Sequence, residues 1–169
     1  MANTFVKIQT ATVGVGGAST IDFTSIPQTY KDLAINLSSR TSRAATQANL
    51  AIKFNNSTSN LTSQVLYGID TSATTYASTQ IEFGSTGNNG TTNAFGIATI
   101  YISNYASSIN KTVSLESSGE TNDANLYIHI TAGLWQNNSA ITTVTLYLRD
   151  AATTFNQYTT ATLYGIKSS

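Results

Sequence analysis

The feature that most constrains the fold is a period-two alternation of apolar and polar residues, repeated in short runs along the chain. Successive side chains of a β-strand point to opposite faces, so each run predicts a half-buried strand. The apolar positions of the runs are Val6 and Ile8; Ile21 and Phe23; Leu33, Ile35 and Leu37; Leu50, Ile52 and Phe54; Val65, Tyr67 and Ile69; Ile81 and Phe83; Ala98, Ile100 and Ile102; Val113 and Leu115; Leu126, Ile128, Ile130, Ala132 and Leu134; Val144, Leu146 and Leu148; and Ala161 and Leu163.

Stretches rich in Gly, Asn, Ser and Thr separate the runs, for example residues 14–17, 55–60 and 84–90, and such stretches form turns. No window has the apolar spacing of three and four residues that an amphipathic helix requires. About ten strands at intervals of roughly 8–16 residues predict an all-β protein, an antiparallel β-sandwich that is jelly-roll-like. No change in composition marks a linker, so we expect residues 1–169 to form a single β-sandwich domain.

The longest run, residues 126–134, predicts that its Leu, Ile and Ala side chains face the core and that the intervening residues face outward. The outward faces of this and two other strands are rich in Thr and Tyr and nearly uncharged. Solvated strand faces usually carry charges, whereas interfaces favour Tyr and are depleted in Lys and Glu. Either Thr is simply a good strand residue here, or the faces belong to a lasting interface. They comprise Tyr127, His129 and Thr131; Thr142, Thr145 and Tyr147; and Tyr158, Thr160, Thr162 and Tyr164.

Charged residues make up only 9% of the chain, and eight Lys and Arg balance eight Asp and Glu. Nucleic acids and anionic membranes attract proteins with a basic excess, so the sequence predicts neither as a partner. The chain has no Cys, which excludes disulfides and thiolate chemistry. Its N-terminus has no secretory signal, and no apolar run reaches the ~20 residues of a membrane-spanning helix. We therefore expect synthesis in a cytoplasm.

The chain carries no motif of a known catalytic class. His129 is the single histidine, and its position in a strand favours a packing role over that of a catalytic base. We predict no enzyme and no cofactor, and we assign no catalytic, cofactor-binding or metal-binding residue. Two binding hypotheses stay open. They are a Ca²⁺ site at Glu116, Glu120 and Asp123, and a sugar site on exposed aromatic residues, for which Tyr76, Tyr105, Trp135 and Tyr158 are candidates; of these, Trp135 is expected to close the core instead.

Three stretches resemble small virion structural proteins of tailed phages. They are SIPQTYKDL at 25–33, ISNYA at 102–106 with NKTVS at 110–114, and YTTATLYGIK at 158–167. AGLW at 132–135, before AIT at 140–142, belongs to the same resemblance. The resemblance spans most of the chain and carries no catalytic group. It implies a jelly-roll domain, usually trimeric, on the surface of a virion that assembles in a bacterial host.

The resemblance implies most directly a capsid decoration, or cement, protein that binds the major capsid protein lattice and stabilises the head. The alternative is a tail-fibre or baseplate domain that recognises a host-surface glycan. A virion-bound glycanase is a third reading, which requires two converging carboxylates. No long shaft is visible, and we expect the 169 residues to be a complete product, which favours decoration. Tyr158, Thr160 and Tyr164, on one uncharged face, are the first interface candidates.

Overall fold

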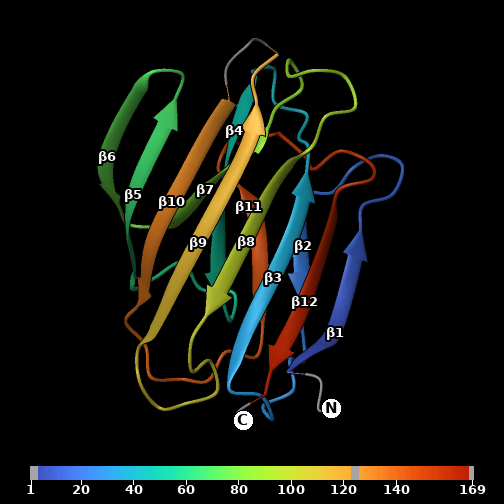
Figure 1. Cartoon of the computed structure of the whole chain (residues 1–169). Helices are drawn as coiled ribbons and strands as arrows, with labels where there is room; N and C mark the ends of the chain where they lie inside the picture. Colours follow the sequence, from blue (N-terminus) through green and yellow to red (C-terminus); the bar gives the residue numbers. More distant parts are fainter. Residues whose placement is uncertain (1–3, 123–125, 168–169) are drawn as a thin grey trace.

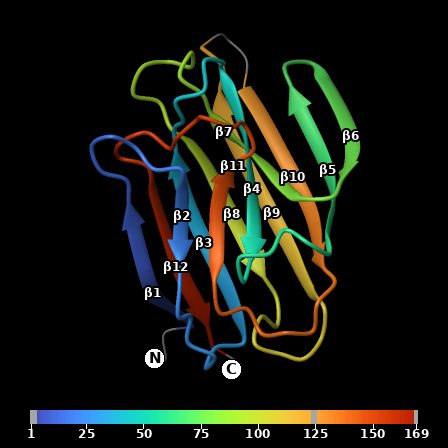
Figure 2. The same cartoon turned by 180° about the vertical axis from the view of Figure 1, so that it is seen from behind.

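The computed structural model describes residues 4–122 and 126–167. These residues form twelve strands and no helix. One sheet has eight strands in the order β1-β12-β3-β8-β9-β10-β5-β6, and the other has four in the order β2-β11-β4-β7. All strand pairs are antiparallel, and the two sheets stack face to face (Figures 1 and 2). The predicted antiparallel β-sandwich is confirmed.

The chain changes sheets at every connection except β5–β6, β8–β9 and β9–β10. This repeated crossing is typical of a jelly roll, as the sequence predicted. The strands are β1 (Phe5–Thr12), β2 (Thr20–Phe23), β3 (Asp32–Ser39), β4 (Gln47–Phe54), β5 (Leu61–Ile69), β6 (Ser72–Ser78), β7 (Ile81–Thr86), β8 (Gly96–Ile102), β9 (Lys111–Glu120), β10 (Leu126–Trp135), β11 (Val144–Leu148) and β12 (Thr160–Ile166).

The structure has twelve strands where the sequence predicted about ten. Strand β6, with the sequence SATTYAS, has no apolar stripe and matched none of the runs. It lies at one edge of the large sheet, is mostly exposed, and is held by its pairing with β5. Because an edge strand outside the core needs backbone pairing more than apolar burial, hydrophobic periodicity does not reveal it.

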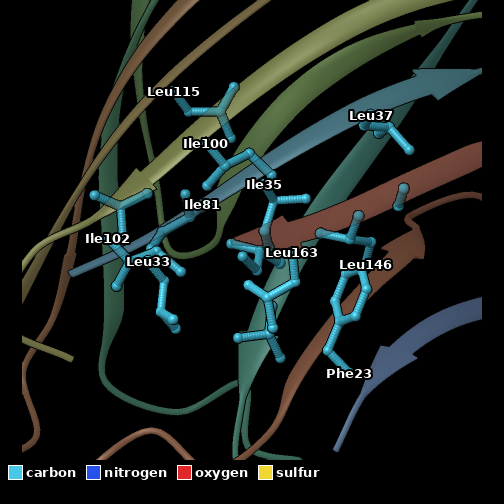
Figure 3. Close-up of a cluster of buried hydrophobic side chains, with 14 of the residues drawn as sticks. Phe23, Leu33, Ile35, Leu37, Ile81, Ile100, Ile102, Leu115, Leu146 and Leu163 are labelled. Carbon is cyan, nitrogen blue, oxygen red and sulfur yellow. The ribbon is translucent and has the colours of Figure 1, made fainter. Parts of the chain in front are cut away.

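Apolar side chains from both sheets fill the space between them (Figure 3). On the large sheet, Ile35 of β3 lies opposite Ile100 of β8 on one side and Leu163 of β12 on the other. Phe23 and Leu146 of the small sheet belong to the same fully or almost fully buried cluster. Most of the predicted apolar stripes therefore face the core as the alternation required.

Two cationic side chains, those of Arg40 and Lys111, are buried, and both donate hydrogen bonds to backbone carbonyls of nearby loops. Arg40 donates hydrogen bonds to four backbone carbonyls in the loop after β7, those of residues 88, 90, 91 and 94. Lys111 is fully buried, and its Nζ donates to the carbonyl oxygens of Ser107 and Ile109, both at 2.7 Å. Its Nζ also lies 5.8 Å from the centre of the Trp135 ring. Several acceptors offset the cost of removing each charge from water.

Strand β10 has the opposite orientation to the one predicted. Tyr127, His129 and Thr131, expected to face outward, are no more than 3% exposed. Ile128 and Ile130, expected to face the core, are 47% and 43% exposed. The more apolar face of this strand therefore points away from the core.

The register of β10 with its neighbours explains this orientation. Thr131 lies opposite Leu115 of β9, which is fully buried, whereas Ile130 lies opposite the exposed Glu116. Directly opposed residues share a face of the sheet, so turning Ile130 inward would carry Glu116 into the core. The buried Thr131 hydroxyl is satisfied because it donates a 2.8 Å hydrogen bond to the carbonyl of Glu82.

Three glycines make room for the inward ring of Tyr127. They are Gly84 of β7, Gly96 of β8 and Gly119 of β9. A Cβ atom at Gly84 would lie 2.6 Å from Cε2 of the ring, and one at Gly96 would lie 2.9 Å from its hydroxyl oxygen. No real side chain tolerates such distances, so the glycines and the orientation of β10 depend on each other.

Matched substitutions test the orientation of β10. Replacing the fully buried Ile100 with Ala leaves a cavity in the core and should lower the free energy of unfolding by about 2–5 kcal/mol. The same replacement at the half-exposed Ile130 should change it by only about 0.5 kcal/mol. Urea denaturation measures both values. Equal costs at the two positions would show that Ile130 is part of the core.

Candidate interaction face and binding cleft

The side of the eight-stranded sheet that points away from the small sheet, here called the outer face, is almost uncharged. The central strands of this sheet are β3, β8, β9, β10 and β12, and the structure describes every residue in them. Their outward positions hold three acidic residues and no basic one. Of these, Asp32 is buried and accepts a 2.6 Å hydrogen bond from the Tyr101 hydroxyl, and Glu120 binds the loop residue Thr91. Glu116 is therefore the one acid among them that is exposed.

A group of exposed aliphatic side chains lies on the outer face. Ile130 lies directly opposite Leu66 of β5, and Ile128 follows on the same side of β10. Ile97 of β8 and Ile128 together line a shallow groove, with Ser118 of β9 between them. Exposed apolar patches on soluble proteins mark interaction sites. The apolar patch comprises Leu66 (41% exposed), Ile97 (62%), Leu126 (68%), Ile128 (47%) and Ile130 (43%).

The interface candidates from the sequence lie on another part of this sheet. Thr160 and Tyr164 point outward from β12 and are half-buried, and Tyr158, in the preceding loop, is 69% exposed. Strand β3 lies between β12 and β8, which carries Ile97 of the apolar patch, and β8 and β9 lie between β3 and β10. The sequence placed Thr160 and Tyr164 on an outward face, where the structure has them, but it missed the patch because it predicted an inward orientation for Ile128 and Ile130.

Two of the four aromatic residues considered for a sugar site are buried, and so is Thr145 of the faces expected outward. Trp135 is 1% exposed and packs against Phe54, with ring centres 5.3 Å apart, so the expectation that it closes the core is confirmed. Tyr105 is fully buried, which removes it as a sugar platform. Thr145 lies on the outward face of β11, as expected, opposite Asp22 and Lys53, yet it is fully buried, and its hydroxyl donates to Asp22 at 2.6 Å.

The acids considered for Ca²⁺ do not converge within the described residues. Glu116 and Glu120 are four residues apart on one strand, which places their Cα atoms roughly 13 Å apart. The Glu120 carboxylate accepts hydrogen bonds from the backbone N–H groups of Thr91 and Asn122, both at 2.6 Å. Asp123 lies outside the described residues. In the part of the chain that is described, no three His, Asp or Glu residues are grouped to hold a metal ion.

A polar cleft with a volume of about 420 Å³ opens between the two sheets beside the β5–β6 hairpin. The hairpin forms one end of the large sheet, where Figures 1 and 2 show it at the side of the molecule. Strands from both sheets and the segments flanking β4 and β11 build the walls. The residues that line the cleft are Arg43, Gln47, Asn49, Tyr67, Tyr76, Glu82, His129 and Arg149.

The charges at the cleft are paired. Arg149 donates from a guanidinium nitrogen to the Glu82 carboxylate at 2.6 Å, and Glu82 is 3% exposed. Nε of Arg43 lies 2.6 Å from a carboxylate oxygen of Asp150, and another of its nitrogens donates to the carbonyl of Gln47. The cleft therefore offers donors and acceptors side by side with no net charge.

Two buried polar atoms at the cleft have no hydrogen-bond partner among the described residues, Nδ1 of His129 and Nε2 of Gln47. The amide oxygen of Gln47 does accept a 2.9 Å hydrogen bond from Tyr67, whose ring meets His129 edge to face at 4.7 Å. Burial lowers the pKa of His129 from 6.5 to about 4, so its imidazole is neutral at pH 7. An unpaired buried donor or acceptor is costly, so these two atoms would gain from a ligand group that reaches them through a shift of the side chains that cover them.

Acid should destabilise the fold through His129. Between pH 6.5 and about 4 the unfolded chain binds a proton at this residue and the folded protein does not. Its contribution to stability is thus complete above pH 6.5 and declines by on the order of 3 kcal/mol as the pH falls towards 4. Urea denaturation across this range measures the loss, and subtracting the His129→Gln profile isolates it from carboxylate titration. Identical slopes in the two proteins would contradict the assignment.

No helix in the described residues is long and apolar enough to cross a membrane. No protein-family model and no curated protein matches the chain. Among solved structures, it is similar to the crystal structure of the galectin LEC-6 from Caenorhabditis elegans, with a TM-score of 0.31 and 7% sequence identity. The similarity covers 94% of this chain and 96% of the galectin chain.

Proposed function

We propose that this chain is a structural protein of a tailed-phage particle, a capsid decoration protein that binds the major capsid protein lattice through its outer face. The observation that carries the proposal is the apolar patch on a nearly uncharged sheet face. A face of this kind is costly to leave in water, and a permanent partner would cover it. The resemblance of the sequence to small virion proteins supplies the identity of that partner.

The size and chemistry of the outer face suit such a role. Eight strands lie about 4.8 Å apart, and the shortest has seven residues at about 3.3 Å each, so the face measures at least roughly 900 Å². A standard interface buries about 800 Å² on each partner. Apolar and hydroxyl groups can be covered without the desolvation cost of Lys or Glu side chains. Weak binding of each copy is sufficient when many copies, or the subunits of a trimer, bind a repeating lattice.

The rest of the proposal follows from the resemblance. The protein is synthesised in the cytoplasm of the bacterial host and resides on the surface of the assembled head as a homotrimer. It has no catalytic role, and the cleft supports this view. Glu82 is the single carboxylate among its lining residues and is paired with Arg149, whereas a glycosidase needs two carboxylates flanking the bond.

A second candidate function is that of a tail-fibre or baseplate domain that recognises a host-surface glycan. The observation that favours it is the polar cleft, in which Tyr76 lies beside amide and guanidinium groups. The two functions use different surfaces, since the apolar patch belongs to the outer face and the cleft lies between the sheets.

A particle-binding assay tests the decoration proposal. Purified protein is mixed with phage heads that lack it, the heads are sedimented, and bound copies are counted. We expect saturable binding at a copy number that matches the capsid lattice. Ile130→Lys, which places a charge in the apolar patch, should weaken binding by at least about tenfold.

Thr58→Lys, in the exposed loop after β4, is the matched control and should bind like the unmodified protein. Both variants change a solvent-accessible side chain, so neither should affect folding, and thermal denaturation checks this. Absence of binding to heads would end the decoration proposal. Binding that Ile130→Lys leaves intact would show that the outer face is not the contact surface.

A further inference from the structure

We propose that the cleft between the sheets is a binding site for a neutral saccharide. The inference uses none of the residues of the apolar patch, so it is independent of the decoration proposal. It rests on four properties of the cleft: its volume, its tyrosine wall, its balanced charge and its unpartnered buried polar atoms.

The volume and the wall fit a sugar ring. The cleft holds about 420 Å³, within the range of roughly 300–1,000 Å³ that small-ligand sites occupy. Tyr67 of β5 and Tyr76 of β6 both line it. Tyr76 pairs with Val65, so the two tyrosines lie diagonally across the hairpin on the same face. A phenol ring offers an apolar surface with a polar edge, which matches the C–H face and the hydroxyl groups of a sugar.

The charge balance selects a neutral ligand. The Arg149–Glu82 and Arg43–Asp150 pairs leave no free cation for a phosphate or carboxylate and no free anion for an ammonium group. The first pair also places an acceptor next to a donor, since Glu82 and Arg149 are joined at 2.6 Å and both line the cleft. A sugar hydroxyl can accept a hydrogen bond from the guanidinium of Arg149, whose side chain is 39% exposed, whereas the Glu82 carboxylate already accepts from Ser78 and Arg149.

The unpartnered atoms supply the specific contacts. Nε2 of Gln47 is a donor, and the neutral ring of His129 offers Nδ1 as either a donor or an acceptor. A hydroxyl group both donates and accepts, so it would satisfy either atom. The amide of Gln47 is already oriented by the 2.9 Å hydrogen bond from Tyr67, which fixes where its free N–H bonds point. A site whose donors are oriented in advance loses less entropy on binding.

The test uses nuclear magnetic resonance with the full chain and defined probes. Glucose, galactose, mannose, rhamnose and N-acetylglucosamine are titrated separately, and glucose 6-phosphate and N-acetylneuraminic acid serve as charged comparators. We expect at least one neutral sugar to cause saturable shifts in the side-chain amide signals of Gln47 and Asn49 and the ring signals of His129. The signals of Ile128 and Ile130 should stay unchanged.

Tyr76→Ala removes part of the wall from an edge strand and should weaken binding by at least about tenfold with an unchanged spectrum elsewhere. Tyr158→Ala removes an exposed tyrosine outside the cleft and should leave binding unchanged. If no neutral sugar perturbs the cleft signals, if a charged comparator binds in preference, or if Tyr76→Ala binds as tightly as the unmodified protein, the proposal is overturned.

Two further measurements separate this inference from others. The sugar that binds is presented both free and as the terminal residue of an immobilised glycan, which distinguishes a metabolite site from recognition of a polysaccharide surface. Tyr76→Ala is also tested in the head-binding assay, where it should bind as the unmodified protein does. The failure of one proposal is thereby visible without the failure of the other.

Discussion

The register of β10 between β5 and β9 is the constraint on which the other features depend. It buries Thr131 beside Leu115 and exposes Ile130 beside Glu116, and it does so along the whole strand because side chains alternate. The same choice creates both candidate sites. It turns the aliphatic side chains of β10 onto the outer face, and it turns His129 inward, where it becomes a wall of the cleft.

The inward face of β10 is polar and aromatic because β7, an edge strand of the small sheet, lies against it. The carbonyl of Glu82 accepts the Thr131 hydroxyl, and Gly84 leaves space for Tyr127 and His129. A shift of β10 by one residue would leave these groups without partners and would replace rings by aliphatic chains over the glycines. Against these losses, burying two isoleucines would gain roughly 1.5–3 kcal/mol each.

The outer face and the cleft differ in shape and in the chemical groups that they offer. The outer face is broad and offers apolar and hydroxyl groups, which suits binding to another rigid protein. The cleft is concave and polar, with paired charges and oriented amides, which suits a small polar ligand. Under the two proposals, the outer face would hold the protein on a lattice while the cleft stays open to a ligand.

Alternation and turn residues alone determine that this chain is an all-β sandwich, and they identify inward residues such as Ile35 and Leu163, because burial of one strand face imposes a period of two. The composition also excludes thiol chemistry, because the chain has no Cys. Three features depend on the tertiary structure and are not encoded in the periodicity. They are the existence of strand β6, the orientation of β10, and the position of Tyr76 in the same cleft as Gln47 and His129. Either face of β10 contains residues that can be buried in a core. Its orientation is therefore determined by its pairing with β5 and β9. The cleft joins residues from both sheets, which only the crossing connections bring together.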